Sequence, residues 1–215
     1  GIRVDYTLSV EMFDWDSAIF DGVTPEMAGD TVLCFASVCA TSTIKKWPGK
    51  RMCLWDLECA MILGRKDSIL GGNSVSHHML NFAAQILEAD PIIMTGIDLS
   101  YTKPYTHAKG TNHAWPEEID KKEDEYQAED WLPSTGKGSD FHPECHRVQA
   151  ILGGPISPQV YVRSSPSYAN FGTLFSILIA KHRKRVYNAC PNGLKIAGTE
   201  YLDHLRGYRN SDTYN

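Results

Sequence analysis

Residues 68–110 read SILGGNSVSHHMLNFAAQILEADPIIMTGIDLSYTKPYTHAKG, and this stretch decides the fold class. A loop rich in glycine and serine comes first, and apolar residues near helical spacing follow it, which predicts a helix over residues 75–87. Pro91 disfavours a helical conformation in the residue before it, so the helix should end there. The apolar run over residues 91–97 predicts a buried strand that ends near Asp98.

The start of this helix is also a predicted ligand site. The N-terminus of a helix presents unpaired N–H groups and the positive end of the helix dipole, and both favour phosphate. Glycines there allow positive φ and a close approach of the backbone to a ligand, while serine and asparagine can cap the helix. Two glycines before a helix are equally compatible with a simple tight turn. The expected nucleotide-binding residues here are Gly71, Gly72, Asn73, Ser74 and Ser76.

Asp98 belongs to the same expected site, because ligands of open α/β sheets collect at the carboxyl ends of the strands. Elsewhere in the chain, apolar runs alternate with helical segments. Strands are expected over residues 3–10, 31–36, 51–55, 160–163 and 186–189, and helices within 37–46, 56–64 and 168–182. This alternation predicts an α/β fold with a Rossmann-like, mostly parallel sheet covered by helices on both faces.

Composition predicts that residues 1–215 form a single domain. The chain is 42% hydrophobic and long enough to bury one sizeable core. Within it, the irregular polar segment 99–143 predicts a lid or binding loop. A net charge of -5 argues against a nucleic-acid binder, which needs a basic face. No apolar run approaches the roughly 20 residues of a membrane span.

Six cysteines are scattered without a CxxC pair. A domain of this size does not need disulfides for its stability, so we expect reduced thiols. These features favour an intracellular, cytoplasmic protein.

Three stretches resemble one known family: GGNSVSHHMLNFAAQILEADPIIMTGIDLSYT…THAKG from residue 71, GIRVD at residues 1–5 and RVYNACPNGLKIAGT at residues 185–199. They are similar to the bacterial 6-hydroxymethylpterin diphosphokinase-like family, a former domain of unknown function. That family includes the central domain of the motility-associated-factor glycosyltransferases that modify flagellin. The G-N-S…G-I-D-L portion is more distantly similar to the nucleotide-binding segment of bacterial CMP-sialic acid-dependent sialyltransferases.

The resemblance implies further site residues. Tyr101, at the start of the Y-T…T-H-A pattern, and Asn188, in the closing motif, are expected at the nucleotide. His107 is the expected general base, because imidazole titrates near neutral pH and can take a proton from an acceptor hydroxyl. It could instead only hydrogen-bond the fold or contact phosphate. In the family a first strand and a G-x-GPSL loop precede the position of residue 1, so we expect the domain to lack them here.

Three functions stay open at this point. The first is a glycosyltransferase-like domain that uses a nucleotide sugar, such as a CMP-linked nonulosonic acid, with a protein or glycan acceptor. The second is pyrophosphoryl transfer from ATP to a pterin, which would need Mg²⁺ on Asp5 and Glu11; these carboxylates are otherwise part of a solvated acidic loop. The third is a non-catalytic nucleotide-binding domain, which the departures from the family at Asn73 and Cys190 keep open. No other cofactor is expected.

Overall fold

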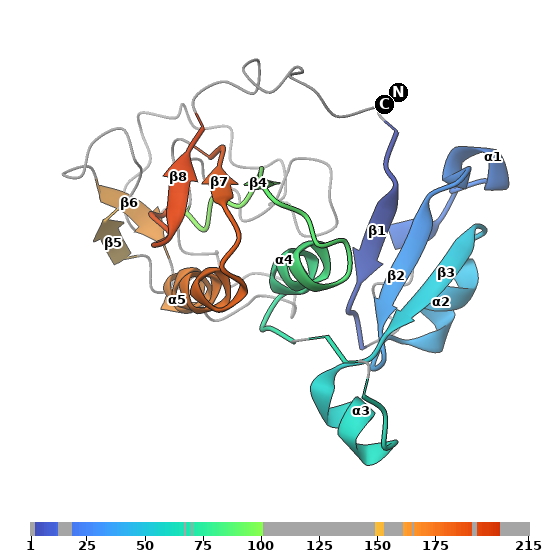
Figure 1. The fold of residues 1–215 in the computed structure, drawn as a ribbon. Helices are drawn as coiled ribbons and strands as arrows, with labels where there is room; N and C mark the ends of the chain where they lie inside the picture. Colours follow the sequence, from blue (N-terminus) through green and yellow to red (C-terminus); the bar gives the residue numbers. More distant parts are fainter. Residues whose placement is uncertain are drawn as a thin grey trace, which may run out of the picture. The chain divides into compact units, whose positions relative to one another are not determined.

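The computed structural model describes residues 3–12, 19–66, 68–69, 71–100, 149–152, 161–164, 166–190 and 193–202. Contacts divide the chain into two compact units, residues 1–89 and 90–215 (Figure 1). Each unit is described by itself below, and the single domain over the whole chain stays a prediction. In the described part, no helix has both the length and the apolar character needed to cross a membrane.

The first unit is built on a parallel sheet in the order β1-β2-β3. The strands are β1 (Tyr6–Ser9), β2 (Val32–Ala36) and β3 (Lys50–Leu54). Short helices follow the strands, and a longer one closes the unit: α1 (Pro25–Ala28), α2 (Thr41–Lys46), α3 (Leu57–Ile62) and α4 (Val75–Gln85). Parallel strands joined by helical crossovers are the α/β arrangement that the sequence predicts.

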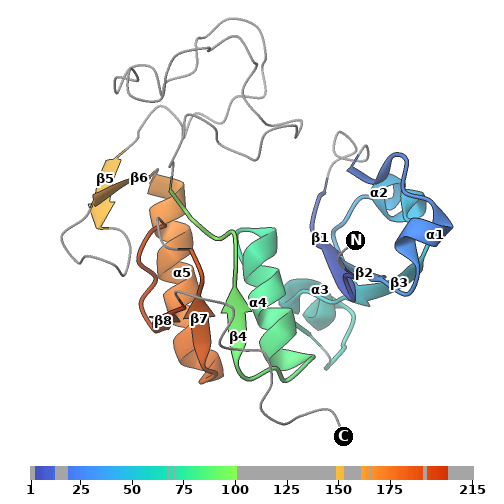
Figure 2. The same ribbon diagram turned by 90° about the horizontal axis from the view of Figure 1, so that it is seen from above.

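The central strand β2 explains why helices lie on both faces of this sheet. Successive side chains of a strand point to opposite faces, and both Leu33 and Cys34 are fully buried. Leu33 packs in a cluster with Phe20, Ala28 and Trp47. On the other face, Cys34 packs in a cluster that includes Phe82 of α4. Figure 2 shows α1 and α2 on one side of the sheet and α4 on the other, so the predicted covering of both faces is confirmed.

The second unit contains another parallel sheet, in the order β4-β7-β8. Its strands are β4 (Ile92–Met94), β7 (Val186–Asn188) and β8 (Thr199–Tyr201). An antiparallel pair, β5 (Gln149–Leu152) and β6 (Tyr161–Ser164), and the helix α5 (Pro166–His182) complete the described elements. Phe175, Leu178 and Ile179 are buried at helical spacing on α5. Gly172 lies against Leu194, because an added Cβ would be 2.7 Å from the Leu194 Cδ2 atom.

Most elements agree with the sequence predictions, and three short ones were missed. Helix α4 begins at the predicted residue and ends two residues early, and β4 covers only three residues of the predicted run. Helix α1 and strands β5 and β8, each of three or four residues, were not predicted. The predicted lid over 99–143 lies outside the described residues, apart from its first two.

Candidate functional site

The carboxyl edge of the first sheet carries a fixed carboxylate. Ser37 follows β2 and Asp56 follows β3, and the two strands end side by side with Ala36 opposite Leu54. The Ser37 hydroxyl donates to the Asp56 carboxylate at 2.9 Å, and the Asp56 backbone N–H approaches the same hydroxyl oxygen at 3.4 Å. Ile69 forms an isolated parallel bridge with Asp56. This bridge brings residue 69, which leads into the loop over residues 71–74, to the same edge of the sheet.

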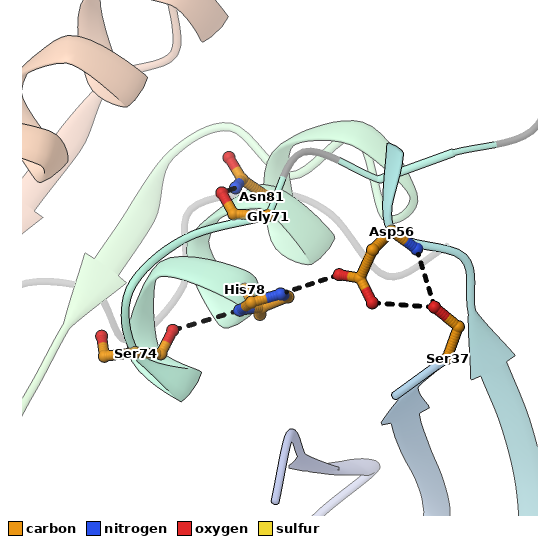
Figure 3. A network of polar contacts seen from close by, with 6 residues as sticks. All are labelled: Ser37, Asp56, Gly71, Ser74, His78 and Asn81. Carbon is orange, nitrogen blue, oxygen red and sulfur yellow. Dashed lines mark hydrogen bonds and ion pairs between the residues drawn. The ribbon is translucent and has the colours of Figure 1, made fainter. Parts of the chain in front are cut away.

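His78 on α4 joins this carboxylate to the loop (Figure 3). The Nε2 atom lies 3.1 Å from the Asp56 carboxylate, and the Nδ1 atom lies 3.2 Å from the carbonyl oxygen of Ser74. Both side chains are buried, with 8% of His78 and 12% of Asp56 exposed. A ring nitrogen donates only when it carries a hydrogen. The two contacts together therefore need two hydrogens on the ring, or one on the ring and one on the carboxyl group.

Gly71 and Gly72 pack against α4, which corrects the expectation of positive φ at these glycines. Neither is among the described residues with positive φ. The Gly71 carbonyl accepts from the side-chain amide of Asn81 at 3.2 Å, and Asn81 is fully buried. A Cβ on Gly72 would lie 2.2 Å from the Cβ of His77. Close approach of backbone and helix, and not left-handed geometry, is the reason for glycine at position 72.

Ser74 occupies the predicted cap position of α4 but does not cap it. Its backbone is extended there, with φ -152° and ψ 160°, and its side chain makes no capping hydrogen bond. The hydroxyl instead lies 2.8 Å from Nδ1 of His77 and 2.9 Å from the Ser76 hydroxyl. The buried imidazole competes with the helix N–H groups for this hydroxyl, so side-chain capping by Ser74 was wrongly predicted. Asn73 is exposed beside it.

Asp98 and Asn188 lie at the carboxyl edge of the second sheet. Met94 at the end of β4 pairs with Asn188 at the end of β7, and Asp98 follows β4. The Asn188 side-chain oxygen accepts the N–H of Cys190 at 3.0 Å, and the Cys190 sulfur accepts the N–H of Ile97 at 3.1 Å. Burial, together with the smaller effects of the charge and hydrogen bond of Asp98, raises the pKa of Cys190 to about 11. Cys190, where the sequence departs from the family pattern, thus interacts with both Asp98 and Asn188, two of the predicted site residues.

The raised pKa makes the reactivity of Cys190 a test of this arrangement. At pH 8 only roughly one molecule in a thousand carries the reactive thiolate when the thiol pKa is near 11. We expect slow alkylation of Cys190 by iodoacetamide in the folded protein at pH 8, faster alkylation as the pH rises towards 11, and complete alkylation in urea. Peptide mass spectrometry measures this, with the half-buried Cys59 as internal reference. Equal rates for Cys190 in folded and unfolded protein would contradict the buried contact.

Asp5 and Glu11 lie at opposite ends of β1, which corrects the expectation of a shared Mg²⁺ ion. Asp5 precedes the strand, is exposed and pairs with Arg3 at 3.4 Å, whereas Glu11 follows the strand. Six residues of extended chain span about 20 Å, too far for both carboxylates to bind one ion. No group of three or more His, Cys, Asp or Glu side chains in the described part could hold a metal. Mg²⁺ dependence itself stays a prediction.

Two expected site residues, Tyr101 and His107, lie outside the described residues. Of the others, the structure brings Gly71, Gly72, Ser74 and Ser76 together in the first unit, and Asp98 with Asn188 in the second. Sequence reasoning missed Asp56 and Ser37. The available signal was their position directly after strands, where the residues of α/β sites are usual. His77 and His78, in the first turn of the same helix α4, are both buried.

Comparison with known proteins agrees with this architecture. The MAf glycosyltransferase from Magnetospirillum magneticum AMB-1 has a similar fold, with a TM-score of 0.63 and 14% sequence identity over 94% of this chain. The chain spans 27% of the length of that protein. No curated protein matches the chain. Residues 1–104 match the model of a family described as 6-hydroxymethylpterin diphosphokinase MptE-like. The family resemblance read from the sequence is thereby confirmed over residues 1–104, which are similar to this MptE-like family.

Proposed function

We propose that the chain is a nucleotide-binding, glycosyltransferase-like domain in which the loop over residues 71–74 and the first turn of α4 bind a nucleotide phosphate. One observation carries the proposal. The head of α4 lies at the carboxyl edge of a parallel sheet, with the Ser74 hydroxyl turned away from the helix N–H groups. Helix N–H groups without a side-chain cap favour an anion. The fold likeness to a glycosyltransferase supports the reaction class.

The finer parts of the proposal concern the substrate and the chemistry. The donor is a nucleotide-activated sugar, with a CMP-linked nonulosonic acid as the specific candidate, and a protein or glycan is the acceptor. Asp98, Tyr101 and Asn188 are the further residues proposed to bind the nucleotide, and His107 is proposed to take the proton of the acceptor hydroxyl. N–H groups at the helix start would stabilise the leaving phosphate as negative charge develops on it.

The family description favours a second candidate, a diphosphokinase that transfers pyrophosphate from ATP to a pterin. Such a reaction needs Mg²⁺ to neutralise the phosphate charges. Asp5 and Glu11 cannot bind one ion together, so at most one of them would serve a given metal. The dependence of nucleotide binding on Mg²⁺ therefore separates the two candidates.

Thermal unfolding with a panel of CMP, CDP, UDP, GDP, AMP and ATP, each with and without Mg²⁺, tests the proposal. A ligand at a hundred times its Kd stabilises the folded state by about 2.7 kcal/mol. We expect a response to CMP that does not need metal. Ser74→Ala should weaken it several-fold, because the loop loses the hydroxyl that joins His77 and Ser76.

Thr41→Ala serves as the control, since this exposed residue at the start of α2 takes no part in the loop. It should leave the response to CMP unchanged. A response to ATP that requires Mg²⁺ would favour the diphosphokinase. No response to any nucleotide in folded protein would overturn both enzymatic candidates.

A further inference from the structure

We propose that Asp56, His78 and Asn81 are positioning residues that preset the loop over residues 71–74 to receive a phosphate group. The inference rests on the proposed nucleotide site and adds the residues that give this site its shape. All three side chains are buried. The pair of Asp56 and His78 and the amide of Asn81 reach the loop from the sheet edge and from α4 (Figure 3).

Two side chains of α4 hold the two ends of the loop. Asn81 donates to the carbonyl of Gly71 at 3.2 Å, and His78 lies with Nδ1 3.2 Å from the carbonyl of Ser74. Residues three apart on a helix lie on the same face. One face of α4 therefore fixes the first and last carbonyl groups of the loop.

These contacts also set the direction of two backbone donors. In a trans peptide the C=O and the following N–H point in opposite directions. The Gly71 carbonyl faces Asn81, so the N–H of Gly72 points away from that amide. The Ser74 carbonyl, which also accepts the backbone N–H groups of His77 at 3.1 Å and His78 at 3.4 Å, faces α4 in the same way, so the N–H of Val75 points away from the ring of His78. Within the described ranges neither N–H donates a hydrogen bond. The carbonyl contacts thus aim two free donors away from α4, as an anion site requires.

The carboxylate of Asp56 determines how the imidazole is oriented. The hydrogen bond at one ring nitrogen determines whether the other nitrogen carries a hydrogen and in which direction that nitrogen points. With Nε2 held by Asp56 at 3.1 Å, Nδ1 faces the Ser74 carbonyl. Ser37 fixes the carboxylate in turn at 2.9 Å. A buried ion pair contributes little stability compared with apolar residues of similar size, so orientation of the loop is the better account of this pair.

Two substitutions of His78 separate orientation from stability. The amide nitrogen of His78→Asn can take about the place of Nδ1 and keep the contact to Ser74, while the contact to Asp56 is lost. The longer His78→Gln keeps the contact to Asp56 and loses the contact to Ser74. Each variant loses one buried hydrogen bond, so both should lower the urea midpoint by similar amounts.

Calorimetric titration with CMP, and with ATP plus Mg²⁺, measures the effect on binding. Whichever of the two probes wild type binds, we expect His78→Gln to bind that probe about tenfold more weakly than wild type does. This difference is the equivalent of one hydrogen bond. His78→Asn should stay within about threefold of wild type. Ser37→Ala, a milder change that folds even if the His78 variants do not, should weaken binding about threefold by loosening Asp56.

The outcomes distinguish this inference from the function on which it rests. Wild-type protein that binds neither probe overturns the proposed function and the phosphate role of the loop together. Binding by wild type with equal affinities in the Asn and Gln variants overturns the positioning role alone. The amide signal of Val75 in a ¹H–¹⁵N spectrum gives a readout without ligand: it should move in His78→Gln and stay close to wild type in His78→Asn.

Discussion

Gly72→Ala is expected to lower the free energy of unfolding of the first unit by about 3 kcal/mol. The new methyl group would lie 2.2 Å from the Cβ of His77 and 2.9 Å from its Cγ. A Cβ is fixed to the backbone, so no rotamer change relieves this clash, and either the loop or α4 must move. Overpacking of a filled core costs about 1–3 kcal/mol. The upper end applies because His77 is fully buried.

Gly71→Ala is the matched control for this prediction. A Cβ there meets its nearest neighbours, the Asp56 carboxylate and Nε2 of His78, at 3.8 Å, which is ordinary contact. Since its φ is not positive, the substitution should change stability by less than about 1 kcal/mol. Urea unfolding followed by circular dichroism measures both variants. Equal stability of the two would show that the loop does not pack on α4 as described.

Asp56→Ala is expected to destabilise the first unit by about 3 kcal/mol. Breaking a buried pair by removing one partner costs about 3–5 kcal/mol, because the remaining polar group is left buried without its partner. Here the ring of His78 would lose the acceptor at 3.1 Å and Ser37 the acceptor at 2.9 Å. The lower end applies because neither side chain is fully withdrawn from solvent, with 8% of His78 and 12% of Asp56 exposed.

A double-mutant cycle with His78→Leu identifies the source of this loss. If the pair interacts as described, Asp56→Ala with His78→Leu should be less destabilised than the sum of the single variants, by about 1–3 kcal/mol. Removing both partners leaves neither the imidazole nor the carboxylate buried without the other. Additive losses in urea unfolding would mean that the two side chains do not interact in solution.

Local pattern was enough to predict the elements that form the site. The apolar spacing before Pro91 located the first residue of α4, and the runs around Leu33 and Val186 located two parallel strands. Patterns of this kind are read within one element, because side-chain periods of 2 and 3.6 are properties of a strand or a helix by itself. For the same reason they predicted the α/β class and the head of α4 as the place to look for a ligand.

The sequence by itself determined the α/β class, the helix at Val75 and the resemblance of the first 104 residues to the MptE-like family. Only the tertiary structure decided that Asp56 pairs with His78 across 22 positions and that Gly72 packs on a helix. It also separated Asp5 from Glu11 by the length of a strand. Those facts depend on which strand ends and helix faces meet, and strand order and packing set that. Residues far apart in the chain share no local period that could reveal it.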